Sequence, residues 1–248
     1  MALTGATPIP ELAAGSMLFA DVSGFTALTS RLVRLHGSRR GAEEMPRFLN
    51  QLYNALIAEV EVRSGSVIGF AGDAITCWFA GDDGTTAVDT ALAMQRAMEQ
   101  FRTVKLDESG LETASLTLKV SVTVGPVKRY VVGDPSVQLI DVVGGDTVSR
   151  LEPLNNLARP GQVVVDEMAA YRLPKAGPSI VTSIGTDTGH PAFVLGAEPG
   201  QTDPVAPTDP PAPTASATPV KAVAAALPSV DQLRAWLLPN VHRRLQAG

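Results

Sequence analysis

Residues 16–198 alternate between two hydrophobic periodicities, and this alternation constrains the fold more than any other feature of the chain. Apolar residues recur every three or four positions in some segments, which predicts helices over 24–35, 43–63 and 85–101 and a weaker one over 146–157. Shorter apolar runs predict strands over 17–21, 66–71, 74–79, 116–124, 127–132, 137–143 and 162–165. This order favours an α+β sandwich in which helices cover a mostly antiparallel sheet.

The composition changes sharply near Pro199. Eight of the thirty residues in 199–228 are proline and none is aromatic, so we expect an extended Pro/Ala-rich disordered linker rather than part of a core. Beyond it, residues 229–248 place apolar side chains at spacings of three and four, which predicts an amphipathic helical tail. We therefore expect an N-terminal lead over 1–15, a globular domain over 16–198, and then the linker and the tail.

The charge and cysteine content exclude several classes of protein. With 20 basic against 25 acidic residues, the chain lacks the positive charge that nucleic acid or an anionic membrane would attract. The single cysteine, Cys77, excludes a disulfide framework and a zinc site built of several thiolates, and it favours a reducing compartment, so we expect a cytoplasmic protein. No signal peptide or membrane-spanning apolar run is evident.

Two aspartates stand at positions suited to chemistry. Asp21 ends an apolar strand and is followed by a tight turn into a helix, whose first amides are free to bind an anion. Asp73 lies at the tip of a hairpin between two apolar strands. If the two tips are adjacent, they supply hard oxygen ligands for Mg²⁺ or Mn²⁺ beside a polyphosphate. The alternative is ordinary turn and helix-cap chemistry, in which each aspartate has a local structural role.

Three sequence blocks resemble the class III nucleotidyl cyclase catalytic domain. They are LFADVSGFTALT at 18–29, FAGDA at 70–74 followed by Trp78-Phe79, and LIDVVG at 139–144 followed by LARPGQ at 157–162. The blocks occur in the order and spacing of that family and span roughly residues 16–195. They are most similar to the metal-donating half of soluble-type adenylyl cyclases.

The resemblance implies a ferredoxin-like α+β domain that works as a dimer, with active sites in the cleft between two such domains. It implies that Asp21, Asp73 and the carbonyl of Val22 bind two Mg or Mn ions. It further implies that the amides around Gly24, Phe25 and Thr26, together with Gly72, hold the phosphates of the substrate ATP. The implied reaction is attack of the ribose 3′-hydroxyl on the α-phosphorus, which gives cyclic AMP and releases pyrophosphate.

The chain departs from the family pattern on one side of that cleft. The base-selecting lysine of the family falls at Gly69, and its asparagine and arginine, which orient the ribose and stabilise the transferring phosphate, fall at Ser149 and Pro153. Asp141 matches the second base-reading position. An alignment shifted by a few residues would instead bring Arg150 or Arg159 near the position of the missing arginine.

These departures predict a metal-donating half-site that needs a complementary cyclase domain, either a second chain or a carboxy-terminal continuation. The isolated chain or its homodimer is then expected to make little or no cyclic nucleotide, and ATP and GTP cannot be told apart from these residues. The alternative is a catalytically inactive cyclase-homology module that serves dimerisation or regulation. A diguanylate cyclase ranks lower, because its Gly-Gly-acid-Glu/Phe hairpin is missing, and loss of the lysine at Gly69 disfavours direct bicarbonate control.

Overall fold

The computed structural model describes residues 12–107, 111–134, 138–174, 178, 180–184 and 191–196. Its centre is an eight-stranded sheet with the strand order β2-β3-β1-β6-β8-β10-β9, in which β7 pairs with the far part of β6. The pairing of β6 with β8 is parallel and the other pairings are antiparallel. The predicted α+β class with a mostly antiparallel sheet is confirmed.

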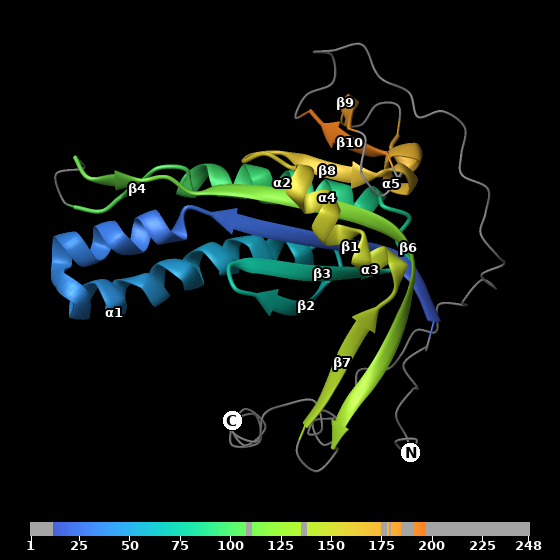
Figure 1. Cartoon of the computed structure of the whole chain (residues 1–248), viewed down its shortest axis with the longest axis horizontal. Coiled ribbons are helices and arrows are strands. Elements are labelled where there is room, and N and C mark those ends of the chain that lie inside the picture. The colour runs from blue at the N-terminus through green and yellow to red at the C-terminus, as the bar shows by residue number, and fades with distance from the viewer. Residues whose placement is uncertain are drawn as a thin grey trace.

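The strands of the sheet vary widely in length. The two longest, β1 and β6, lie side by side in the middle, and β6 continues beyond the sheet as a hairpin with β7 that projects from the body (Figure 1). A separate pair, β4 (Val104–Lys105) and β5 (Thr113–Ala114), forms a small hairpin. The strands of the main sheet are β1 (Leu12–Ser23), β2 (Ser66–Ala71), β3 (Ala74–Ala80), β6 (Thr117–Asp134), β7 (Gln138–Gly144), β8 (Val163–Asp166), β9 (Ile180–Ile184) and β10 (Ala192–Leu195).

Helices lie on both faces of the sheet, as Figure 1 shows. The two long helices, α1 (Phe25–Glu61) and α2 (Thr85–Met98), cover one face, and α2 ends in a short 3₁₀ turn over Glu99–Phe101. The short helices α3 (Asp146–Ser149) and α4 (Leu151–Leu157) lie on the other face, and α5 (Glu167–Arg172) follows β8. Within the described residues, no helix is long and apolar enough to cross a membrane.

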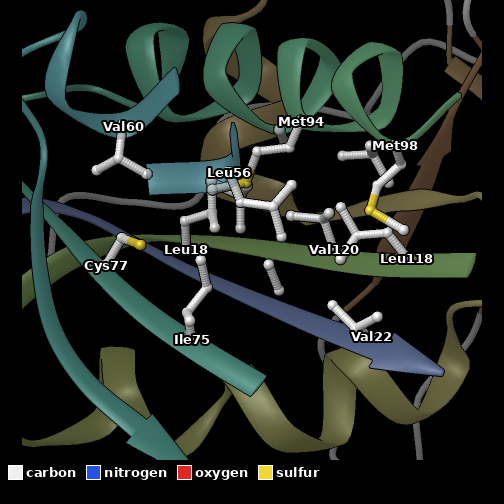
Figure 2. Packing of buried hydrophobic residues seen from close by; sticks show 14 of the residues in the cluster. Leu18, Val22, Leu56, Val60, Ile75, Cys77, Met94, Met98, Leu118 and Val120 are labelled. Atoms are coloured by element: carbon white, nitrogen blue, oxygen red, sulfur yellow. The ribbon is translucent and has the colours of Figure 1, made fainter. Parts of the chain in front are cut away.

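The main core lies between the sheet and the two long helices. Figure 2 shows Leu18 and Val22 of β1 and Leu118 and Val120 of β6 pointing toward α1 and α2. These are alternate residues along each strand, as expected for strands with one face in the core. The next residues along β1, Met17, Phe19 and Asp21, therefore face α3 and α4.

Two predicted boundaries differ from the structure. The strands predicted over 116–124 and 127–132 are one continuous strand, β6, so the predicted break at residues 125–126 is wrong. Strand β8 pairs with β6 as far as Val122 and β7 pairs from Lys128, so Pro126, which has no amide hydrogen, falls between these two partners. The two helices predicted over 24–35 and 43–63 are joined in α1, which is kinked at Gly37, where φ is 78° and ψ is 164°.

The N-terminal boundary expected for the globular domain differs from the structure. The first strand begins at Leu12, four residues before the expected start of the domain at residue 16. The expected linker over 199–228 and helical tail over 229–248 lie outside the described residues.

Candidate active site

The two candidate aspartates lie together at one end of the sheet. Antiparallel pairing of β1 with β3 places Asp21 opposite Ala74, the residue that follows Asp73. The amide of Val22 donates a hydrogen bond to the carbonyl oxygen of Asp73 at 3.3 Å, which joins the end of β1 to the tip of the β2–β3 hairpin. The Asp73 side chain is exposed, and that of Asp21 is 22% exposed. The sequence analysis left the adjacency of the two tips as a condition, and in the structure the two tips are adjacent.

A helix begins directly beside these carboxylates. Gly24 has a φ of 111°, and an added Cβ would lie 2.4 Å from the carbonyl oxygen of Ser115, so both its conformation and its surroundings require glycine. This turn lets α1 begin at Phe25, three residues after the buried Val22. The first amides of a helix have no partner within it, and here they include those of Phe25 and Thr26. At the hairpin tip, Gly72 has a φ of 64° and open space around it.

The pKa of Tyr53, a residue of α1, is raised partly by the charges of both aspartates. Burial raises the pKa of the Tyr53 hydroxyl, and the negative charges of Asp73 and Asp21 raise it further. Its ring lies edge-on to that of Phe70 in β2, with 5.8 Å between ring centres. Both carboxylates therefore lie near the Tyr53 hydroxyl. Across the described part of the chain, no cluster of three or more histidine, cysteine, aspartate or glutamate side chains that could hold a metal is present.

Two polar residues beside Asp21 were not identified from the sequence. Lys119 of β6 lies opposite Asp21, and its Nζ forms an ion pair with Asp21 Oδ2 at 2.9 Å. Asn155 of α4 points Nδ2 at the same oxygen from 3.4 Å, and its buried Oδ1 has no hydrogen-bond partner among the described residues. A signal for Lys119 was available, because polar residues alternate along 117–123 and place it on the face opposite the core. Asn155 interrupts an apolar helix face without any such pattern.

Three of the positions that depart from the family pattern are exposed or have open space beside them. A Cβ added to Gly69 in β2 would meet no atom within 4 Å. Ser149 and Pro153 are both exposed, and Pro153 occupies the first turn of α4, where its missing amide hydrogen has no helical partner to lose. Asp141 lies in β7, where its backbone pairs with Val131.

The guanidinium of Arg150 contacts Asp166, Asp146 and the backbone of Val124 in its own domain. Its Nη1 lies 2.6 Å from Asp166 Oδ2, its Nη2 donates to the carbonyl of Val124 at 3.0 Å, and its Nε lies 3.0 Å from Asp146. Burial raises the pKa of Asp166, while Arg150 and the amides of Ala169 and Val124 act in the opposite direction. Arg159 is exposed at the end of α4, and its amide donates to the side chain of Gln162.

Comparison with solved structures shows the same fold in cyclase domains. The guanylate cyclase domain of RhGC from Catenaria anguillulae, solved in complex with GTP, is 18% identical with a TM-score of 0.57, over 74% of this chain and 96% of that one. The adenylyl cyclase CyaB from P. aeruginosa is 17% identical with a TM-score of 0.58, over 74% of this chain and 94% of that one.

Sequence comparison finds relatives among soluble-type enzymes and identifies the family. Adenylate cyclase type 10 of Oryctolagus cuniculus is 26% identical over 151 residues, which are 61% of this chain but 9% of the relative, so the chain spans a small part of that protein. The family model of the adenylate and guanylate cyclase catalytic domain matches residues 9–185. Because this match covers most of the chain and the fold agrees, the chain belongs to the adenylate and guanylate cyclase catalytic domain family.

Proposed function

We propose that this chain is the metal-donating half of an adenylyl cyclase site, and that it converts ATP to cyclic AMP and pyrophosphate together with a complementary cyclase domain. The observation that carries the proposal is the junction of Asp21 and Asp73 beside the start of α1. The similarity to adenylate cyclase type 10 favours ATP as the substrate.

Each residue of this junction has a proposed part in holding the substrate. Asp21, Asp73 and the Val22 carbonyl hold two Mg²⁺ or Mn²⁺ ions, which supply charge neutralisation at the nucleophile and the leaving group when bound. The amides around Gly24, Phe25 and Thr26 bind the terminal phosphates through the free end of α1, with Gly72 beside them. The chain thus positions the triphosphate and its cations, while the groups that read the base and stabilise the transition state come from the partner.

The composition of the opposite face supports the need for a partner. Gly69, Ser149 and Pro153 offer neither an ammonium, a carboxamide nor a guanidinium, and Arg150 is held by Asp166 and Asp146. Loss of one preorganised donor to a transition state costs about 3–4 kcal/mol in well-studied enzymes. Loss of the arginine alone is therefore enough to lower cyclic-nucleotide synthesis by a homodimer about a hundredfold or more.

The projecting β6–β7 hairpin offers a surface for that partner. Tyr130 and Val142 are paired across it and are 45% and 39% exposed. Two large apolar side chains, side by side on an arm outside the core, favour burial against a second domain.

Metal-dependent binding of nucleotide tests the proposal against an inactive module. We expect Mn²⁺ to strengthen the binding of a fluorescent ATP analogue at least tenfold in the wild-type chain, and we expect Asp73→Asn to abolish this gain because it removes a cation ligand. Asp89→Asn, the same change on an exposed residue of α2, is the control and should bind like the wild type.

Binding that is independent of Mn²⁺, or equal in the wild type and Asp73→Asn, would contradict the metal half-site. The same result would favour the second candidate, a cyclase-homology module with a dimerisation or regulatory role, which the empty position at Gly69 also favours.

A further inference from the structure

The carboxylate of Asp21 is already neutralised by a side chain of the same domain. The ammonium of Lys119 lies 2.9 Å from Asp21 Oδ2, and the two side chains are 20% and 22% exposed, so this pair is largely shielded from solvent. Asn155 approaches the same oxygen at 3.4 Å and adds a second, uncharged donor.

The position of Lys119 is fixed by the sheet rather than by a flexible loop. Residues 117–128 of β6 pair continuously with β1, and Lys119 and Asp21 are direct partners in this register. Directly opposed residues of an antiparallel pair have Cβ atoms about 5 Å apart, so the ammonium stays within reach of the carboxylate. A divalent cation that binds Asp21 must therefore displace Lys119 or accept a positive charge a few ångströms away.

We propose that Lys119 is an internal counter-ion that competes with the divalent cation for Asp21 and thereby makes metal and triphosphate binding cooperative. This inference rests on the proposed metal site. Without nucleotide, the ammonium opposes the cation through charge repulsion that is only partly screened at such a shielded position. A triphosphate brings several negative charges, which offset the excess positive charge of the cation and Lys119 together.

Such coupling is reciprocal by thermodynamic necessity. If the triphosphate strengthens metal binding by some factor, the metal strengthens triphosphate binding by the same factor. The chain would then bind little metal alone and take up the cation and the nucleotide together.

Mn²⁺ binding to the whole chain, measured from the electron paramagnetic resonance signal of free Mn²⁺ without nucleotide, tests the competition. We expect Lys119→Met to tighten Mn²⁺ binding about tenfold, within the range of known coupling factors, and Lys119→Arg to behave like the wild type because it keeps the charge. Lys128→Met removes a charge from an exposed position in the same strand and should change nothing. Thermal unfolding of each variant establishes that it is folded.

A second readout follows the nucleotide. The factor by which Mn²⁺ strengthens the binding of 2′,3′-dideoxy-ATP should fall in Lys119→Met by about as much as nucleotide-free Mn²⁺ binding rises. Equal or weaker Mn²⁺ binding by Lys119→Met would overturn the competition while leaving the metal site in place. Mn²⁺ binding that Asp21→Asn leaves unchanged would instead overturn the metal site itself, and the competition with it.

Discussion

At the scale of single residues, the candidate site depends on positions held by backbone geometry. Asp73 is placed by a hairpin tip whose carbonyl accepts from Val22, and the start of α1 is placed by Gly24 in a conformation that other residues rarely adopt. The side chains that act on Asp21, by contrast, come from distant parts of the sequence. Lys119 is 98 residues away and Asn155 is 134 residues away.

Cys77 gives a prediction about pH at this scale. The thiol is fully buried in β3 beside α1, and burial raises its pKa from 9.0 to about 12 (Figure 2). Below pH 9 the thiol is protonated in both states, whereas above it the unfolded thiol ionises and the folded one keeps its proton. We therefore expect the free energy of unfolding to fall with rising pH above 9, by about 1.4 kcal/mol per unit from this residue.

Urea unfolding between pH 8 and 10.5 measures this effect. Cys77→Ala removes the thiol, so its stability should fall less steeply over the same range. Equal slopes for the two proteins would show that the thiol does not stay protonated in the folded state.

The residue-scale predictions from the sequence succeeded where the signal was local. The turn after Asp21 and the hairpin around Asp73 are visible as short motifs. Their adjacency, which the sequence left open, follows from the pairing of β1 with β3. The contact of Lys119 with Asp21 depends on the register between β1 and β6, and a shift of one residue would place Lys119 on the opposite face. No local pattern fixes that register.

At the scale of elements, Arg150 and Asp166 join three parts of the domain. The pair links α3 and α4 to β8, and Arg150 also bonds β6 through Val124, while Asp166 caps α5 through the amide of Ala169. The side chains are 19% and 4% exposed. A buried charge left without its partner is costly, so this contact is a structural one.

Arg150→Met is expected to lower the free energy of unfolding by about 3 kcal/mol, because it leaves the Asp166 carboxylate buried without its cation. Urea denaturation gives the value. Arg102→Met, which breaks an exposed pair with Glu99 at 68% and 65% exposure, is the control and should cost less than about 1 kcal/mol. An Arg150→Met protein as stable as the wild type would show that Arg150 is available for another role.

The elements themselves were predicted unevenly. Helix α2 and the β2–β3 hairpin have strong periodic patterns and were predicted close to their observed bounds, whereas α1 was predicted as two helices. The break predicted between the strands at residues 125–126 was wrong because the pairing of β6 with β1 continues through both residues. The short strands β9 and β10 were not predicted, since four or five residues carry too little periodicity to stand out.

At the scale of the whole molecule, the proposed function implies an asymmetric site. One end of the sheet holds two carboxylates, the start of a helix and a lysine. The positions that the family uses for base recognition and transition-state stabilisation hold Gly69, Ser149 and Pro153 instead of a lysine, an asparagine and an arginine. The sequence alone predicted this asymmetry through family motifs, because the roles follow residue identity. It could not identify the proposed partner, because the residues of this chain do not indicate which domain would supply the complementary groups.

The most direct test of this account is a cyclase assay with ATP and with GTP, in Mn²⁺ and in Mg²⁺, on the chain alone and mixed with a cyclase domain that carries the lysine, asparagine and arginine. We predict cyclic AMP from the mixture, almost none from the chain alone, and at least a hundredfold loss in the mixture with Asp21→Ala or Asp73→Ala. The proposed half-site would be contradicted if the chain alone made cyclic nucleotide at the rate of the mixture. It would also be contradicted if neither Asp21→Ala nor Asp73→Ala lowered the activity of the mixture.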